Sequence, residues 1–412
     1  MHNPNRRKLL IAGATIGLGS FAYSYNRGFR YPRFGLEPEQ PSTSERHSNA
    51  IITITDGIFL KSEQKTKLRA IAPEPSLEIE FTDADELVLS VNNIASNAVL
   101  DITGKDIKLV DEEINGITRT LTLKSRNAQT IKLDWSLPES DSFTFSVIGD
   151  SGGNDELLWG IERSHEIGAQ FLLHLGDFNY HEGEYELAID RFQNALIPVY
   201  VTIGNHDFND SGLVYQHFLD NIGPMNNAFT LGGTRFINMD TGADFFPVNG
   251  GHRGDMFEAL SKTTKGLSDQ VAFTHRPFEN ARPAPGKNKH DHVAGGPTEV
   301  NWLKESLKRV NCDTLLAGHV HHSDEREVDG IQQWTAGEGL GSKDMSNRKP
   351  TSTFLVGQVE RGKKVSYTWL PLNMPWSYHK SYYHIKHMQK KQLESHLEWF
   401  EQALAKEAKT NT

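Results

Sequence analysis

Five short motifs in the middle of the chain each join an apolar run to residues that can bind a metal ion. The first three place an oxygen ligand directly after a glycine, at intervals of 27 and 28 residues, and the last two supply histidines. Carboxylate, amide and imidazole groups are common protein ligands of metal ions. Together these motifs indicate a two-metal site. The candidate ligands are Asp150, Asp177, Asn205, His275, His319 and His321.

The spacing of the motifs predicts the elements that position them. A gap of 27 or 28 residues holds one helix and the next strand of a β-α-β unit. Parallel strands end at one edge of a sheet, where the ligands of open α/β folds collect. Strands and helices alternate from residue 143, with helices at 185–196 and 297–310 and antiparallel patterns at 226–240 and 325–370. We therefore predict an α/β fold with two packed mixed β-sheets flanked by helices.

The regions on either side of this part have other patterns. Residues 48–136 contain short alternating runs separated by turn residues, which predicts a small antiparallel β-sandwich without metal-type clusters. Residues 137–141 are predicted to be a hinge into a domain at 142–372 that carries the five motifs. Residues 376–408 have the apolar spacing of a terminal helix that packs on the body or mediates association.

The first 24 residues carry the pattern of an export signal. Arg6 and Arg7 precede a Gly-rich, weakly apolar run that is too short to span a bilayer. Paired arginines in this context resemble a twin-arginine signal of bacteria, which implies use of the export machinery and a periplasmic or secreted protein. An ordinary secretory signal or an uncleaved anchor is the alternative. Residues 25–47, rich in Pro, Ser and charge, are predicted to be a linker.

Composition narrows the class of protein. The chain has 412 residues, 37% of them hydrophobic, so it can bury a sizeable core. A formal charge of −10 argues against a sequence-independent nucleic-acid binder, which needs a basic face. The single cysteine, Cys312, excludes an intrachain disulfide and a thiolate zinc cluster, and we expect it to be a buried structural thiol.

The five motifs in order, G-D-x-G, G-D-x-x-Y, G-N-H-D, a His before x-Pro, and G-H-x-H, resemble those of the calcineurin-like metallophosphoesterases. Within that superfamily they are most similar to the purple acid phosphatase branch. Most members have Asp-x-His in the first motif, whereas here Gly152 fills the histidine position. Tyr180 resembles the branch's replacement ligand, a phenolate that trivalent iron can hold deprotonated. The resemblance implies an αββα sandwich, and plant-type members carry a β-sandwich before it.

The resemblance also implies which residues bind which metal. The ferric site would consist of Asp150, Asp177, Tyr180 and His321. The second site, for divalent Fe, Zn or Mn, would consist of Asp177, Asn205, His275 and His319. Asp177 would bridge the two ions. His206 resembles the family's phosphate-contacting histidine and proton donor, and Asp207 is placed to orient it as a second catalytic residue.

The resulting prediction is an exported hydrolase of small-molecule phosphate monoesters that uses a metal-activated hydroxide. The alternatives are a phosphodiesterase or nucleotide hydrolase with two divalent metals, and a non-catalytic phosphate-binding protein on the same scaffold. No nucleic-acid partner and no stable membrane span of the mature chain are expected. His174 lies within a predicted strand and is expected in the core. His252, Arg253, His290 and His292 lie in Gly-rich sequence and are expected in solvated loops, with substrate contact as the alternative.

Overall fold

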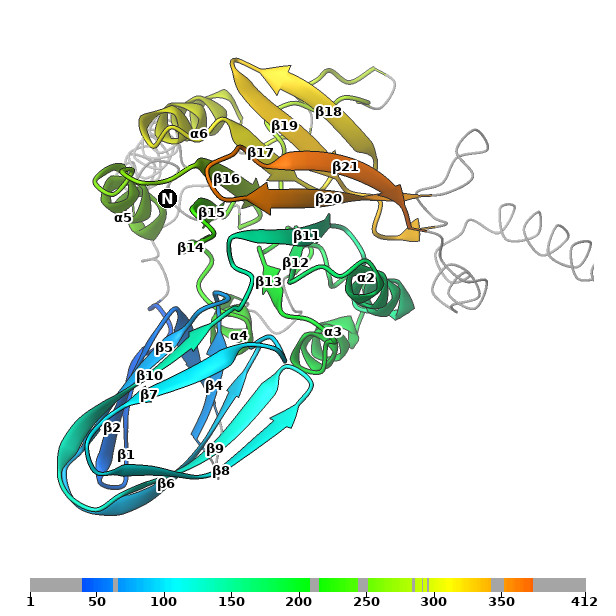
Figure 1. Cartoon of the computed structure of the whole chain (residues 1–412). Coiled ribbons are helices and arrows are strands. Elements are labelled where there is room, and N and C mark those ends of the chain that lie inside the picture. The colour runs from blue at the N-terminus through cyan, green and yellow to red at the C-terminus, as the bar shows by residue number, and fades with distance from the viewer. Residues whose placement is uncertain are drawn as a thin grey trace, which may run out of the picture.

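The computed structural model of the protein describes residues 39–61, 66–207, 215–243, 251–283, 286–290, 292–294, 296–341 and 352–372. Figure 1 shows a strand-only part below a part in which sheets and helices alternate. The predicted export signal, most of the linker and the predicted terminal helix lie outside the described residues. No helix in the described ranges is long and apolar enough to cross a bilayer.

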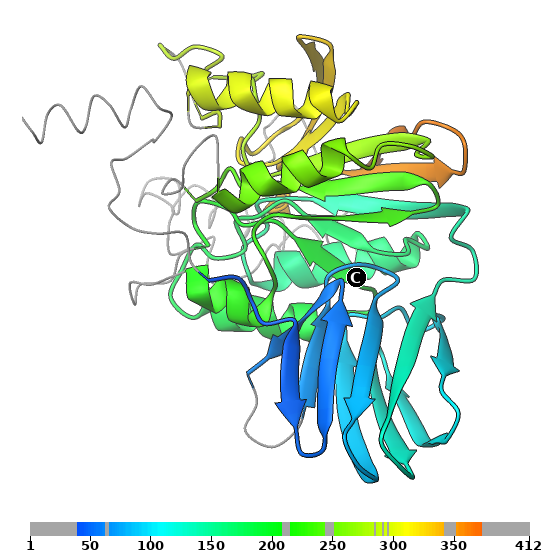
Figure 2. The same cartoon turned by 90° about the vertical axis from the view of Figure 1, so that its left-hand side faces the viewer.

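Ten strands form the N-terminal part as two five-stranded sheets, which Figure 2 shows below the rest of the molecule. Side chains alternate between the two faces of each strand, and the buried set, which includes Ile79, Leu121 and Leu133, forms a shared core. The first sheet runs β1 (Ser44–His47), β2 (Ala50–Thr55), β5 (Ser76–Phe81), β10 (Gln129–Ser136), β7 (Val99–Thr103). The second runs β3 (Gly57–Leu60), β4 (Thr66–Ala70), β6 (Asp85–Asn92), β9 (Thr118–Ser125), β8 (Ile107–Asn115).

Several details of this part differ from the sequence prediction. Strand β1 lies in the predicted linker, and β4 pairs with β6 in parallel, so the region is not wholly antiparallel. Strands β3, β4 and β8 were not predicted. The first two are short and mostly buried, which hides the alternation, and β8 is exposed along its length and contains a bulge between Leu109 and Asp111.

The first sheet of the α/β part is mixed. Strands β11 (Ser142–Ile148), β12 (Leu172–His174) and β13 (Val199–Val201) are parallel neighbours, and β20 (Thr353–Glu360) and β21 (Ser366–Pro371) extend the sheet antiparallel from β11. Apolar side chains of α2 (Asp155–Glu166), α3 (Glu184–Gln193) and α4 (Tyr215–Asn221) form one core with the outer face of this sheet.

The second sheet is also mixed, and other helices cover it. Its order is β14 (Asn227–Leu231), β15 (Thr234–Asn238), β16 (Asp269–Thr274), β17 (Thr314–Ala317), β19 (Ile331–Ala336), β18 (Ser323–Val328). The helices α5 (Gly251–Ser261) and α6 (Pro297–Arg309) pack on its outer face. Aromatic side chains, among them Phe145, Phe171 and Phe236, fill the space between the two sheets. The predicted fold class, two packed mixed sheets flanked by helices after a strand-rich region, is confirmed.

Candidate metal centre

Neighbouring parallel strands deliver the candidate ligands to one edge of the molecule. In the first sheet, Asp150, Asp177 and Asn205 follow the carboxyl ends of β11, β12 and β13. In the second sheet, His275 follows β16 and His319 follows β17, and these strands are again parallel neighbours. The edges of two packed sheets therefore meet at the ligands, as the strand-end argument predicts.

Two of the motif glycines permit the ligand loops to approach one another closely. A Cβ on Gly204 would lie 2.2 Å from both the backbone nitrogen and Oδ1 of Asp177. A Cβ on Gly318 would lie 2.6 Å from Oδ2 of Asp150. Since ordinary contacts of a Cβ begin near 3.4 Å, no side chain fits at these two positions without moving a ligand.

Four candidate ligands hold an unusual backbone conformation. The φ angles are 61° at Asp150, 58° at Asp177, 71° at His319 and 33° at His321. Residues other than glycine rarely adopt this left-handed region, and it costs of order 1–3 kcal/mol per residue. Such strain concentrates where the surrounding structure fixes a side chain for function, which fits a preorganised ligand set.

One group of ligand atoms surrounds His275. Its Nε2 lies 2.9 Å from Oδ1 of Asn205, 3.1 Å from Nδ1 of His319 and 3.3 Å from Oδ1 of Asp177. Its Nδ1 lies 2.8 Å from the Leu175 carbonyl oxygen, to which it donates, so Nε2 faces the group. Metal bonds of 2.0–2.2 Å separate neighbouring ligands by roughly 3 Å, and the group therefore has the dimensions of a coordination shell.

A second group lies on the other side of Asp177. The Tyr180 hydroxyl oxygen is 3.4 Å from Oδ2 of Asp177 and 3.4 Å from Nε2 of His321, which in turn is 3.9 Å from Oδ1 of Asp150. That Asp150 oxygen is buried and has no hydrogen-bond partner among the described residues, while its Oδ2 accepts from the His319 backbone. Asp177 thus presents one oxygen to each group.

Tyr180 occupies the space beside Gly152, where relatives are expected to carry a histidine. A Cβ on Gly152 would lie 3.3 Å from the Tyr180 ring. The buried Glu184 fixes the loop of Tyr180, because its Oε2 accepts from the backbone nitrogens of Tyr180, at 2.6 Å, and His181, at 3.0 Å. The absence of a side chain at Gly152 therefore leaves room for the Tyr180 ring.

The charged groups of the site shift one another's pKa. Burial raises the pKa of Asp150 to about 7. Burial opposes the protonation of His275, but Asp177 outweighs it and raises the pKa of His275 to about 10. Burial likewise opposes ionisation of Asp177, whose pKa is nevertheless depressed by His275. Burial lowers the pKa of His319 well below its usual value. The buried carboxylates therefore attract a positive charge, which a cation would supply in place of the proton.

His206 and Asp207 lie next to this centre but differ in environment. The His206 side chain is exposed, its ring centroid is 4.9 Å from that of Tyr180, and its backbone nitrogen donates to Oδ1 of Asp177. Asp207 is buried, and its carboxylate accepts from the backbone nitrogens of Asp177, Phe178 and Gly204. We predicted that Asp207 orients His206, and the structure corrects this prediction. The Asp207 carboxylate instead holds the two ligand loops together.

The other residues considered in the sequence analysis lie in the core or in a helix. His174 is buried in β12, where its Nε2 lies 2.8 Å from the Ser151 hydroxyl, and burial lowers its pKa to about 3, so it is a neutral core residue. His252 and Arg253 lie in α5 rather than in a loop. Arg253 is buried and pairs with Glu299 at 2.8 Å, so the predicted solvated environment is wrong for it. Cys312 is buried, in agreement with the expected structural thiol.

Of the two remaining loop histidines, His290 is exposed and His292 lies against the ligand set. The ring centroids of His292 and His319 are 5.4 Å apart, and His292 has a φ of 60°. Both residues are exposed, as expected for solvated loop residues. The signal for His292 was its position in a Gly-rich loop shortly after the His275 motif, but loop geometry decides which residue of such a loop reaches the centre.

Comparisons with known proteins find similarity in the part of the chain that carries the candidate ligands. Residues 143–323 match the family model of the calcineurin-like phosphoesterases. A purple acid phosphatase from yellow lupin (Lupinus luteus) seeds is 12% identical, over 78% of this chain and 77% of that one, with a TM-score of 0.46. A structure of PhoD is 10% identical, over 71% and 83%, with a TM-score of 0.42.

A dimetal phosphatase from Danio rerio is 14% identical, over 55% of this chain and 98% of that one, with a TM-score of 0.39. A search of curated proteins found no match. The family model covers the strands and loops that carry the two ligand groups. Residues 143–323 of the chain are thus similar to the calcineurin-like phosphoesterases.

Proposed function

We propose that the protein hydrolyses phosphate monoesters at a dinuclear metal centre of the purple acid phosphatase type. The observation that carries the proposal is the position of Asp177, whose two carboxylate oxygens face two separate groups of ligand atoms. A carboxylate shared in this way is suited to bridge two ions. The family match of residues 143–323 supports phosphoester chemistry in general, and the tyrosine beside Gly152 supports the purple type in particular.

The residues present fit two ions. The buried Oδ1 of Asp150 has no hydrogen bond within the described residues and would be stabilised by a cation, and the atoms around His275 have the spacing of a coordination shell. Asp150, Asp177, Tyr180 and His321 would hold Fe(III), and Asp177, Asn205, His275 and His319 would hold divalent Fe, Zn or Mn. When bound, such a pair activates water and neutralises the phosphate charge.

The charges of the ligand set favour a phosphate dianion despite the acidic chain. Two carboxylates and one phenolate bring three negative charges, whereas a ferric and a divalent ion bring five positive charges. The centre would then be cationic in a protein of formal charge −10.

His206 has the position of a proton donor to the leaving group. Its ring is exposed, so a substrate can reach its nitrogens, and its backbone is tied to Asp177 by a 2.9 Å hydrogen bond. The imidazolium would give a proton to the ester oxygen as the bond to phosphorus breaks. His292, beside His319, is placed to contact the phosphate from the opposite loop.

The N-terminal motif supports export as a separate proposal. Arg6 and Arg7 before a weakly apolar run favour a bacterial periplasmic or secreted location by the twin-arginine route. Cell fractionation of the full chain tests this. The double variant Arg6→Lys with Arg7→Lys is expected to stay in the cytoplasm, and its normal export would refute the assignment.

The hydrolysis of p-nitrophenyl phosphate tests the enzyme assignment. Wild type is expected to turn over the ester and Asn205→Ala to lose at least 10²-fold in kcat, because the second site loses a ligand. Equal rates would favour a non-catalytic binding protein. A visible tyrosinate–iron absorption band that disappears in Tyr180→Phe would support the purple type, and an active, colourless, iron-free protein would favour two divalent ions. A parallel panel of diesters separates monoesterase from phosphodiesterase activity.

A further inference from the structure

Strand β13 lies at the edge of the first sheet, although it carries part of the proposed centre. It pairs with β12 on one side only. The bonds to β12 use the Pro198 carbonyl and the Thr202 nitrogen. The backbone nitrogen and oxygen of Val199 therefore face away from the sheet, and a buried edge needs other partners for them.

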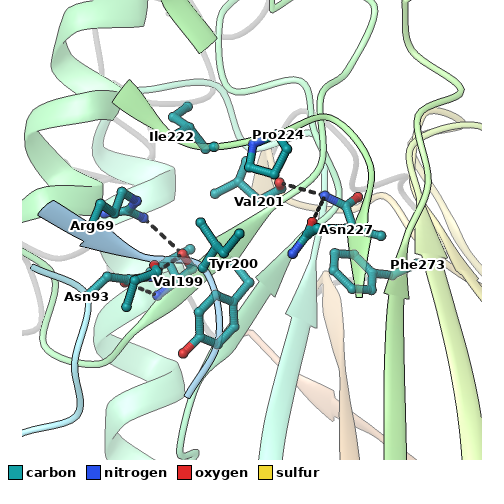
Figure 3. A pocket seen from close by; sticks show the side chains of 13 residues that line it. Arg69, Asn93, Val199, Tyr200, Val201, Ile222, Pro224, Asn227 and Phe273 are labelled. Carbon is teal, nitrogen blue, oxygen red and sulfur yellow. Dashed lines mark hydrogen bonds between the residues drawn. The ribbon is translucent and has the colours of Figure 1, made fainter. Parts of the chain in front are cut away.

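A side chain of the N-terminal sandwich supplies these partners. Oδ1 of Asn93 accepts from the Val199 nitrogen at 2.8 Å, and Nδ2 donates to the Val199 oxygen at 3.2 Å and to the Ala70 oxygen at 2.9 Å. The amide of Asn93 thus pairs with Val199 as a residue of a neighbouring strand would. Asn93 is fully buried, and its φ of 68° aims the side chain at β13 (Figure 3).

Two further residues of the sandwich strengthen this contact. Nη2 of Arg69 donates to the Val199 oxygen at 3.0 Å, and its Nη1 donates to Oδ1 of Asn92 at 2.9 Å. Nδ2 of Asn92 donates to the carbonyl of Gln193, the last residue of α3, at 2.7 Å. The sandwich therefore holds both ends of the connection between α3 and β13.

The elements held in this way lead directly to the centre. Asn205 and His206 follow β13 after three residues, and Glu184, the first residue of α3, fixes the loop of Tyr180. A shift of β13 changes the position of Asn205. A displacement on the order of 1 Å at a reacting group is enough to lower a rate about 10²-fold.

We propose that the β-sandwich is a structural part of the metal centre, and that Asn93 is a positioning residue that sets Asn205 and His206 through the edge of β13. The proposal rests on the proposed function for its catalytic consequence. Its mechanical part, the coupling of Asn93 to residues 199–206, does not depend on metal or substrate.

The test compares Asn93→Gly with two controls. Glycine tolerates the left-handed φ, so the substitution removes the amide without backbone strain. Asn311→Gly is the same change at an exposed residue with a φ of 61°, remote from the sandwich. Leu123→Ala removes a buried side chain of β9 and so destabilises the sandwich core. Leu123 pairs with Leu87, at the opposite end of β6 from Asn92.

Amide hydrogen exchange of the purified full chain gives the first measurement. Exchange in residues 199–206 is expected to accelerate at least 10-fold in Asn93→Gly and to match wild type in both controls. The second measurement is titration of metal-free protein with Zn²⁺, where Asn93→Gly is expected to bind about 10-fold more weakly, with kcat reduced and KM unchanged.

Equal exchange and equal Zn²⁺ affinity in Asn93→Gly and Leu123→Ala would overturn the proposal. If wild type neither binds Zn²⁺ nor hydrolyses the ester, the proposed function fails, while the exchange data still decide the coupling. If Asn93→Gly does not fold, Asn92→Ala, which loses the bond to the Gln193 carbonyl, carries the same comparison.

Discussion

The close packing of Gly318 against Asp150 makes a single methyl group a sensitive probe of the centre. In Gly318→Ala the new Cβ would lie 2.6 Å from Oδ2 of Asp150, whereas ordinary contact begins near 3.4 Å. The two groups must therefore separate by about 0.8 Å. The carboxylate has little room to retreat, because it is fully buried and a Cβ on Gly337 would also lie only 3.0 Å from the same oxygen.

The displacement is expected to reach both metal groups. The His319 backbone nitrogen donates to Oδ2 of Asp150 at 2.7 Å, so moving either partner shifts the turn that carries His319 and His321. A misplacement of nearly 1 Å corresponds to a loss of about 10²-fold in kcat. Overpacking of this size costs about 1–3 kcal/mol in stability, which leaves the protein folded.

The assay combines kcat for p-nitrophenyl phosphate, metal content per chain and the thermal midpoint. Gly254→Ala is the matched control, because a Cβ at this helical position meets no atom within 4 Å and alanine favours a helix. We expect Gly254→Ala to keep the wild-type kcat and metal content. If Gly318→Ala also kept both, the argument that the motif glycines exist for close approach of the ligand loops would be wrong.

Three further predictions concern charge and metal. Burial raises the pKa of Asp240 to about 7. The folded chain therefore retains a proton on Asp240 that the unfolded chain loses above about pH 4. The contribution of Asp240 to the free energy of unfolding consequently falls as the pH rises from 4 to 7. Asp240→Asn should abolish that fall, which amounts to at most about 4 kcal/mol, and parallel pH dependences of urea unfolding in both proteins would contradict it. Removal of bound metal by a chelator should lower the thermal midpoint of wild type. It should leave the midpoint of the double variant Asp150→Ala with His275→Ala unchanged, and scanning calorimetry with and without chelator measures both. His292→Ala should raise KM for the aryl phosphate about 10-fold with little change in metal content, and an unchanged KM would remove His292 from the substrate side.

The sequence indicated which side chains gather at the strand ends better than it indicated the strands of the sandwich, for a physical reason. Strand-end motifs such as G-D and G-H combine a glycine needed for close approach with a ligand, so residue type and spacing together report geometry. The edge strand β8 lacks such a signal. Its apolar residues Leu109, Val110 and Ile114 are themselves exposed, so an alternation of buried apolar and exposed polar residues does not mark it.

Tertiary contacts decide the features that the sequence could not predict. The motif G-N-H-D does not reveal that Asp207 turns inward to accept three backbone amides while His206 remains exposed. Arg253 lies in a Gly-rich stretch that suggests a loop, yet it belongs to helix α5. Its side chain is buried there and pairs with Glu299. The approach of His292 to His319 likewise depends on backbone conformation that residue types do not specify.

The division of the candidate ligands between two sheets would give bound ions a mechanical role. Asp150, Asp177 and Asn205 come from one sheet and the histidines from the other, so two ions would cross-link the layers along their shared seam. With one cysteine, the chain has no intrachain disulfide to do this. Metal uptake would then report that both layers have already docked, and metal loss would loosen the seam while leaving the N-terminal strands in place.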